Sequence, residues 1–313
     1  MKTDKLFSVV LRTRNEIRNI SNFIESYKLQ SYELKELIIV DNYSTDGTRE
    51  WLEAQGIPYH LKGNERVEQG NYGMLQLARG RWVGYFDADM YLSSNLISNL
   101  VKAFQADGDL VGIRIREIVL GKSFGSRIRR FERAFYEDTC VDAARAFVRT
   151  TLLAANGFDL ECFPTPSAED WDLDRRIAED GLLGFLNKNS EELYSAQTIH
   201  FAKERGFVSE DNWPCFFHNE AEFNWQWYFK KKIYYSKSLG QYVKKWGNKD
   251  SLVRKQLGFK YRFFQVFIEN KKYKRVLRNP QLMLVLWVQL FVVGLLFSIV
   301  RIAISAPIRL SVR

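Results

Sequence analysis

The sequence predicts an α/β fold with a mostly parallel central sheet and helices on both faces. In residues 1–90, short apolar runs rich in β-branched residues alternate with longer segments whose apolar residues recur at helical spacing. Polar residues follow these runs directly, as expected where parallel strands end at one edge of a sheet. Alternation of this kind favours a parallel sheet, because each crossover helix returns the chain to the same edge.

The expected elements follow the chain in order. Short apolar runs are expected to be strands: residues 6–11, 37–40, 58–61 and the run that ends at Asp87. The segments between them have helical spacing and are expected to be helices: residues 15–28, 48–55 and 70–78. The less regular second half predicts strands at 110–118 and 144–148 and a helix at 168–180. The ends of the strands at Leu11, Val40 and Phe86 should open onto one crevice.

Two aspartates, Asp87 and Asp89, stand at the C-terminal tip of the apolar run 82–86. Open α/β sheets bind ligands outside the carboxyl ends of their strands. Two carboxylates there can hold a divalent cation, which in turn holds a diphosphate. Aspartate is also a common turn residue after a strand, so the rest of the chain must decide.

The charge of the chain is divided unevenly. The 313 residues carry a formal net charge of +9, but residues 221–313 hold 19 Lys and Arg against 3 Asp and Glu. Residues 1–220 hold 27 basic and 34 acidic residues. An acidic domain is therefore joined to a strongly basic part, which suits nucleic acid or an anionic membrane surface.

A long uncharged segment favours the membrane. Residues 282–300 are 19 positions without a charge, enough to span a bilayer core of roughly 30 Å. Basic residues precede it: Lys271, Lys272, Lys274, Arg275 and Arg278. The positive-inside rule then places this flank and the preceding domain in the cytoplasm. A buried core helix is the alternative, and a membrane segment would either cross the bilayer or lie in one leaflet.

The chain before this segment is aromatic and basic. Residues 225–237 interleave Trp, Tyr and Phe with Lys. Such a pattern can stack nucleobases or lie at a lipid interface. The apolar segment downstream favours the lipid interface, so we expect a membrane partner and no nucleic acid.

Four motifs stand in order along the first two-thirds of the chain. They are SVVLRTRNE at 8–16, IIVDNYSTDGT at 38–48, GNYG, ARG and DAD within 70–89, and NGFD with EDWDL within 156–173. Together they resemble the motifs of the family 2 glycosyltransferases, which are inverting enzymes of the Rossmann-like GT-A fold. The resemblance covers residues 5–205. It implies a nucleotide-diphosphate sugar donor, built on UDP or GDP.

The resemblance implies that a set of residues near the strand ends binds this donor: Thr13, Glu16, Asp41, Asn71 and Asp87. Asp41 is expected to accept a hydrogen bond from the nucleobase, and Asp87 to lie near the ribose and the donor sugar.

The first two motifs also leave details open. Arg12 stands where many members have Pro, and Arg14 where many have Tyr, so this loop departs from the family pattern. Within the second motif, Ser44 is expected to cap the following helix rather than to touch the donor.

The resemblance also implies a metal site and a catalytic base. Asp89 is expected to ligate Mg²⁺ or Mn²⁺, with His200 as a further ligand and His218 as the second choice. Asp170 is expected to take the proton of the acceptor hydroxyl, and Glu169 to position the acceptor or the base. Alternatively, both acids merely favour the N-terminus of a helix.

The stretch KKKIYYSKS at 230–238 resembles the tail of membrane-associated members that build lipid-linked or surface glycans. It implies that Lys231, Tyr235 and Lys237 contact the acceptor or a lipid phosphate. The expected reaction is sugar transfer to a hydroxyl of a membrane-bound acceptor, either polyprenyl-linked or a cell-surface glycan. Two alternatives stay open: a polyprenyl-phosphate sugar synthase, whose acceptor is the lipid phosphate itself, and a non-catalytic nucleic-acid-binding protein.

The expected organisation has four parts. A GT-A domain covers residues 1–218, and a basic aromatic helical region covers 219–279. A transmembrane or membrane-embedded helix follows over 280–304, and a short basic tail over 305–313.

Overall fold

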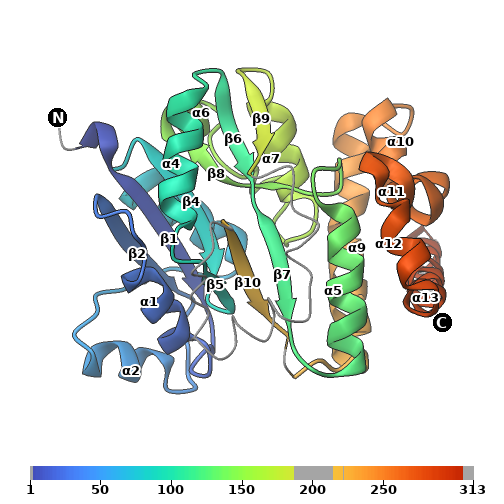
Figure 1. Ribbon diagram of the computed structural model, residues 1–313, viewed down its shortest axis with the longest axis horizontal. Coiled ribbons are helices and arrows are strands. Elements are labelled where there is room, and N and C mark those ends of the chain that lie inside the picture. The colour runs from blue at the N-terminus through green and yellow to red at the C-terminus, as the bar shows by residue number, and fades with distance from the viewer. Residues whose placement is uncertain (1–2, 187–213, 221, 306–313) are drawn as a thin grey trace, which may run out of the picture.

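A computed structural model describes residues 3–186, 214–220 and 222–305 of the chain. The larger sheet has the strand order β3-β2-β1-β4-β8-β6-β9 (Figure 1). Its strands are β1 Phe7–Thr13, β2 Lys35–Asp41, β3 His60–Leu61, β4 Trp82–Asp87, β6 Leu110–Arg114, β8 Ala144–Val148 and β9 Leu182–Phe185. Neighbours pair in parallel except at β8, which is antiparallel to β4 and β6. The predicted mostly parallel sheet is confirmed.

Helices cover both faces of this sheet, as predicted. Neighbouring residues of a strand point to opposite faces, so Val9 and Val10 of β1 belong to different apolar clusters. The helices whose apolar residues join the cluster of Val9 are α1 Ile20–Lys28, α2 Thr48–Ala54 and α4 Leu96–Ala106. Those that join the cluster of Val10 are α3 Arg66–Asn71, α6 Arg149–Ala154 and α7 Glu169–Ile177.

A smaller sheet lies beside the edge at which β4 ends. It contains β5 Met90–Leu92, β7 Arg116–Leu120 and β10 Cys215–Asn219, with β10 in the middle. The single strand predicted over residues 110–118 is wrong, because the chain passes from the large sheet to the small one at Ile115. Arg114 is held by Asp174 of α7, whereas Arg116 pairs with Glu137, so the two arginines fix the chain to different parts of the molecule.

Two predicted helices have different bounds. The helix expected over residues 15–28 begins at Ile20, because Asn15 has a positive φ of 56° and the next N–H groups bond to side chains of the 44–48 loop. The helix expected over 70–78 is divided into α3 and a π-helical segment, η2 Tyr72–Leu77. At Gly73 this segment lies directly on β1, and an added Cβ would stand 2.3 Å from Val10.

The C-terminal part is helical, as predicted. Its helical segments are α9 Trp225–Trp246, α10 Ser251–Leu257, η4 Tyr261–Gln265, α11 Val266–Ile268, η5 Glu269–Lys271, α12 Tyr273–Arg278 and α13 Pro280–Ser305. Figure 1 shows them gathered at one end of the molecule beside α5 Phe124–Tyr136. By length and composition, α13 could cross a membrane over Pro280–Phe297.

One face of α13 packs on the protein. Met283, Leu286 and Leu290 are buried in an apolar cluster with residues of α5 and α11. Buried Gln289 donates hydrogen bonds to Glu132 of α5 at 3.1 Å and to Tyr228 of α9 at 2.8 Å. These polar contacts fix the register of α13 on its neighbours.

Candidate active site

The carboxyl ends of β2, β1 and β4 bring predicted donor residues to one edge of the large sheet. The parallel register places Thr13 beside Asp41 and Arg12 beside Asp87. The predicted meeting of these strand ends at one edge of the sheet is therefore confirmed, and a crevice over this edge stays a prediction. Thr13 Oγ1 is buried and has no hydrogen-bond partner, so it can accept or donate to a ligand.

Asp41 is held by the loop that follows it. It is fully buried and accepts hydrogen bonds from the backbone N–H of Ser44 at 2.8 Å and from its hydroxyl at 2.5 Å. The prediction that Ser44 caps α2 is wrong, since Asp46 instead accepts from the N–H of Thr48, the first residue of that helix. The contact of Asp41 with a nucleobase stays a prediction.

Asp87 is the centre of a charged cluster. Arg12 is 3% exposed and donates from Nε to Asp87 Oδ1 at 2.9 Å, with Nη2 at 2.7 Å from the same oxygen. Arg66 of α3 lies 4.0 Å from the other carboxylate oxygen. Burial would raise the pKa of Asp87, but these arginines, Arg12 above all, hold it well below its ordinary range. The carboxylate is thus ionised and rigidly placed.

Asp89 lies in the turn between β4 and β5, beside a histidine. His218 Nε2 is 3.1 Å from Asp89 Oδ2, and His218 Nδ1 is 2.8 Å from Glu117 Oε1. Burial would lower the pKa of His218, but Asp89 and Glu117 together raise it well above its ordinary value. His200 lies outside the described residues, so its predicted role as a ligand remains a prediction.

The surroundings of Asp89 fit a cation in part. Its Oδ1 is buried without a hydrogen-bond partner, which is a cost unless a ligand meets it. Carboxylate oxygen suits both Mg²⁺ and Mn²⁺. Among the residues that the structure describes, however, no three His, Cys, Asp or Glu side chains are already grouped as a metal site.

Two other predicted donor residues have different surroundings. Burial, with the nearby charge of Asp89, raises the pKa of Glu16 to about 7. Asn71 donates to the carbonyl oxygen of Phe158 and accepts from its N–H, both at 2.8 Å. The charge of Asp89 thus acts on Glu16, whereas Asn71 connects α3 to the loop after α6 through its two hydrogen bonds. Their donor contacts stay predictions.

The two candidate catalytic acids, Glu169 and Asp170, begin α7. Asp170 Oδ1 accepts a hydrogen bond from the hydroxyl of Tyr85 at 2.8 Å, and its second oxygen has no donor among the described residues. Glu169 is fully buried, 3.5 Å from Nη2 of Arg66. Burial and the neighbouring charge of Asp170 raise the pKa of Glu169 to about 7. Because Arg66 also faces Asp87, it links the donor-side carboxylate to the two candidate catalytic acids.

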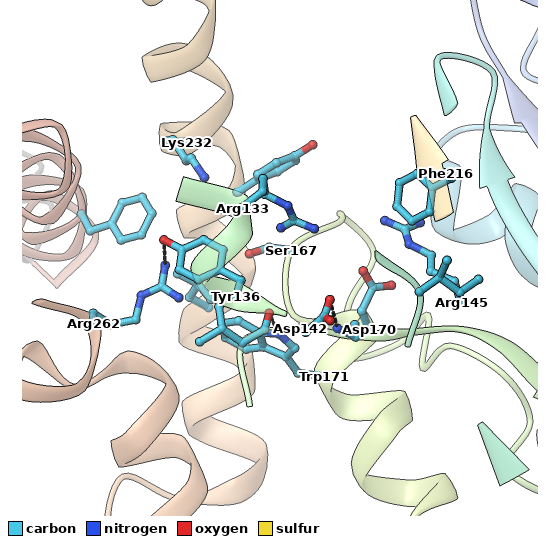
Figure 2. A pocket seen from close by; sticks show the side chains of 16 residues that line it. Arg133, Tyr136, Asp142, Arg145, Ser167, Asp170, Trp171, Phe216, Lys232 and Arg262 are labelled. Atoms are coloured by element: carbon cyan, nitrogen blue, oxygen red, sulfur yellow. Dashed lines mark hydrogen bonds between the residues drawn. The ribbon is translucent and has the colours of Figure 1, made fainter. Parts of the chain in front are cut away.

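A cavity of about 200 Å³ opens beside Asp170 (Figure 2). Asp170 and Arg145 of β8 line one side, and Lys232 of α9 and Arg262 of η4 come from the other. Phe297 of α13 also lines it. The cavity therefore extends from the candidate base to the C-terminal helices.

The predicted acceptor residues of α9 are only partly brought to this cavity. Tyr235 lines it, and the guanidinium of Arg66 lies 5.3 Å from the centre of its ring. Lys231 does not line the cavity, and its Nζ lies 4.6 Å from the ring of Trp227. The side chain of Lys237 lies outside the described part of the chain.

The sequence profile described as glycosyl transferase family 2 matches residues 8–157, which include the ends of β1, β2 and β4. Just under half of the chain therefore matches the sequence pattern of this family. An uncharacterized glycosyltransferase of Nostoc sp. is 30% identical over 112 residues, which are 34% of each of the two proteins. The match thus spans about a third of that relative's length.

Solved structures share the fold of this chain at low identity. A mannosyltransferase from Pyrobaculum calidifontis, PcManGT, in complex with GDP-Man and Mn²⁺, has a TM-score of 0.56 at 15% identity, covering 96% of this chain and 86% of its own. S. aureus TarS 1–349 in complex with UDP-GlcNAc has a TM-score of 0.50 at 14% identity, covering 90% and 79%. The expected GT-A fold is confirmed.

Sequence reasoning missed three residues of this candidate site. Arg145 interrupts the apolar strand 144–148, which is a visible signal for a functional or paired charge. Tyr85 looked like an ordinary core aromatic, and only the fold brings its hydroxyl to Asp170. Arg66 gave no signal, because it precedes the segment whose spacing predicted a helix.

Proposed function

We propose that the protein transfers a sugar from a nucleotide-diphosphate sugar to an acceptor hydroxyl. One observation carries the proposal: Arg66 faces both the donor-side carboxylate Asp87 and Glu169, while Tyr85 holds the adjacent Asp170. The match of residues 8–157 to the family 2 profile supports the reaction class. The nucleotide sugars named in the neighbouring structures support a donor of this class and leave its nucleobase and its sugar open.

The chain's own residues suit a single displacement. The acceptor oxygen attacks the anomeric carbon, and its proton passes to the free oxygen of Asp170 as the bond to the diphosphate oxygen breaks. Tyr85 holds Asp170 in place, and the contact of Glu169 with Arg66 fixes the start of α7. One displacement of this kind inverts the anomeric configuration. General base catalysis typically contributes a factor of about 10² to 10⁴.

We propose that Asp89 holds Mg²⁺ or Mn²⁺, with His218 beside it and His200 as the further predicted ligand. The unpartnered Oδ1 of Asp89 supports this assignment. A bound cation would stabilise the negative charge that develops on the leaving diphosphate.

We propose an acceptor that is held at a membrane. Apolar side chains are exposed along the outer side of the C-terminal helices: Phe259, Phe264, Ile268, Leu277, Leu284, Val288, Phe291 and Leu295. Exposed cations lie among them in the sequence: Lys260, Lys271, Lys274 and Arg278. Apolar and basic side chains together suit an anionic lipid surface. Since the other face of α13 packs on α5 and α9, we infer that this helix meets one leaflet along its outer face.

The runner-up is a polyprenyl-phosphate sugar synthase. Its acceptor oxygen belongs to a phosphate that is already ionised, so it needs no base. The cavity that joins Asp170 to α13 admits either acceptor, and the free oxygen of Asp170 favours the hydroxyl.

A nucleotide-sugar panel tests the reaction. The full chain in detergent is incubated with UDP- and GDP-sugars, with Mn²⁺, Mg²⁺ or chelator, and thermal stabilisation and release of nucleoside diphosphate are measured. The proposal expects metal-dependent stabilisation and turnover with at least one donor. Asp89→Ala should abolish the metal dependence, whereas Asp180→Ala, at an exposed position, should not. A metal titration that Asp89→Ala leaves unchanged removes the role assigned to this residue.

Vesicles test the membrane surface. The full chain should sediment with phosphatidylglycerol vesicles more than with phosphatidylcholine vesicles. Leu277→Asp should weaken this binding, because Leu277 is 74% exposed on α12. Leu29→Asp, at a 50% exposed leucine beside α1, serves as the matched control. Equal binding by both variants would count against this surface.

A further inference from the structure

Three basic side chains reach the cavity beside Asp170 from separate elements. Arg133 comes from α5, Lys232 from α9 and Arg262 from η4. Figure 2 shows Lys232 and Arg262 on the side of the C-terminal helices, with Arg133 between them and Arg145. The fold therefore concentrates positive charge at the end of the cavity opposite the candidate base.

The protein satisfies these cations only in part. Arg133 Nε and Arg262 Nη1 are both buried without a hydrogen-bond partner. Arg262 has one hydrogen bond, a long one of 3.4 Å to the hydroxyl of Tyr136. No described carboxylate pairs with Lys232, whose Nζ lies 5.2 Å from the ring of Tyr228. Unpaired donors and cations at half-buried positions are costly, so they indicate a missing anion.

The acids around the cavity do not supply that anion. Glu117 bonds to Arg133 through a different nitrogen and is shared with His218. Glu132 is engaged by Arg129, and also by Tyr136 and Gln289. Burial raises the pKa of Asp142 to about 7, so this carboxyl is only partly ionised at neutral pH.

We propose that Arg133, Lys232 and Arg262 bind a phosphate group carried by the acceptor. This inference rests on the proposed glycosyl transfer and names the class of its acceptor. Guanidinium groups match phosphate oxygens through paired N–H donors. Burial lowers the pKa of Lys232 to about 7, so this lysine is partly charged at neutral pH and gains its full charge when an anion binds beside it. The cavity of about 200 Å³ has far more room than a single water molecule needs.

The position of the cluster agrees with an acceptor phosphate. Asp170, at the other end of the cavity, is available for the acceptor hydroxyl, and Phe297 of α13 offers an apolar wall. A phosphate on a lipid carrier would place its chain toward α13, whereas a phosphate on a water-soluble glycan would need no apolar wall. Both share the chemistry that the three cations recognise.

Binding to three probes tests the subsite. The full chain in detergent micelles is titrated with farnesyl phosphate, farnesol and inorganic phosphate. The variants are Lys232→Gln and Arg262→Gln, with Lys230→Gln as the control at an exposed neighbouring lysine. Each cavity variant should weaken farnesyl phosphate binding about tenfold, the loss of one charge-assisted hydrogen bond, and leave farnesol binding unchanged. Inorganic phosphate should compete with farnesyl phosphate for the parent protein if the phosphate group is what the cluster recognises.

The probes also separate the two sources of the phosphate. Farnesyl phosphate that binds much more tightly than inorganic phosphate assigns the subsite to a lipid carrier, and equal affinities assign it to a phosphate on a soluble glycan. Unchanged farnesyl phosphate binding in both variants overturns the subsite. Variants that lose nucleoside diphosphate binding but keep farnesyl phosphate binding also overturn the subsite, because the three cations would then bind the donor.

Melting temperature gives a second readout. Removal of an unpaired half-buried cation should keep or raise the melting temperature of the ligand-free protein while phosphate binding weakens. A lower melting temperature in both variants would show that the protein itself satisfies these cations and would overturn the proposal. The outcome is independent of catalysis, so failure of the nucleotide-sugar panel and failure of the phosphate subsite are distinguishable.

Discussion

Replacement of Arg12 by methionine tests how the donor-side carboxylate is held. Arg12 is 3% exposed and meets Asp87 Oδ1 with two nitrogens, at 2.9 and 2.7 Å. Its guanidinium also lies 4.7 Å from the centre of the Tyr85 ring. Methionine fills much of the space of the arginine stem, so the substitution removes the charge and the hydrogen bonds while adding little cavity.

The expected loss of unfolding free energy is about 3 kcal/mol. Removal of one partner of a buried ion pair typically costs about 3–5 kcal/mol, because the other charge is left uncompensated. Arg66, 4.0 Å from Asp87, supplies part of the compensation and places the effect at the lower end. Urea denaturation at pH 7, followed by intrinsic fluorescence in detergent, measures it. Since Arg12 lowers the pKa of Asp87, the difference from the parent should shrink as the pH falls below about 4.

A matched substitution provides the control. Arg18 forms an ion pair with Glu222, but their side chains are 73% and 78% exposed. Exposed pairs contribute about 0–1 kcal/mol, so Arg18→Met should leave stability nearly unchanged. If Arg12→Met and Arg18→Met cost the same, the buried pair does not fix Asp87 as we describe.

Three further substitutions test other parts of the account. The melting temperature of Glu169→Gln should rise relative to that of the parent between pH 5 and pH 8. The pKa of Glu169 is raised from 4.5 to about 7 in the folded protein, so the parent loses stability as the pH rises from 4.5 to 7, and the glutamine variant does not. A difference in melting temperature that is independent of pH would refute this prediction. Gln289→Leu should lower the free energy of unfolding by about 1–3 kcal/mol in urea denaturation, since α13 loses two buried hydrogen bonds. Gln281→Leu, at an exposed position, is the control, and equal stability of the two variants would refute the docking of α13. Gly73→Ala should lower the free energy of unfolding by about 1–3 kcal/mol in the same assay, because the added Cβ would stand 2.3 Å from a valine of β1. A Cβ added at Gly108 has nothing within 4 Å, so Gly108→Ala is the control. Similar stability of the two variants would contradict the close approach at Gly73.

The sheet and the position of its ligand edge could be predicted because their signals are local. The runs that became β1, β2 and β4 are short, apolar and followed at once by polar residues, and parallel pairing then brings Thr13, Asp41 and Asp87 together. The division of residues 110–118 between two sheets could not be predicted in this way. It depends on Arg114 and Arg116 finding acids that are distant in the sequence.

The site shows the same limit. Asp170 and Asp89 could be selected from motifs, but their neighbours depend on long-range packing. Tyr85 reaches Asp170 from a strand 85 positions earlier, and His218 reaches Asp89 from 129 positions later. The basic stretch of α9 was predicted as an acceptor region, yet periodicity could not tell which of its lysines faces the cavity. The structure selects Lys232, which lines the cavity, over Lys231, which does not.

The role of Asp170 is the centre of the account. Asp170→Asn keeps the size of the side chain and a possible contact with Tyr85, but it removes the carboxylate that takes the proton. The experiment first identifies a donor and an acceptor with the parent protein, and then measures donor binding and single-turnover transfer for the parent, the variant and Asp180→Asn.

The account predicts that transfer by Asp170→Asn falls by at least about 10², while donor affinity and the Asp180→Asn control stay near the parent values. Transfer by Asp170→Asn near the parent rate, with donor binding intact, would contradict the assignment and would favour an acceptor that is already ionised.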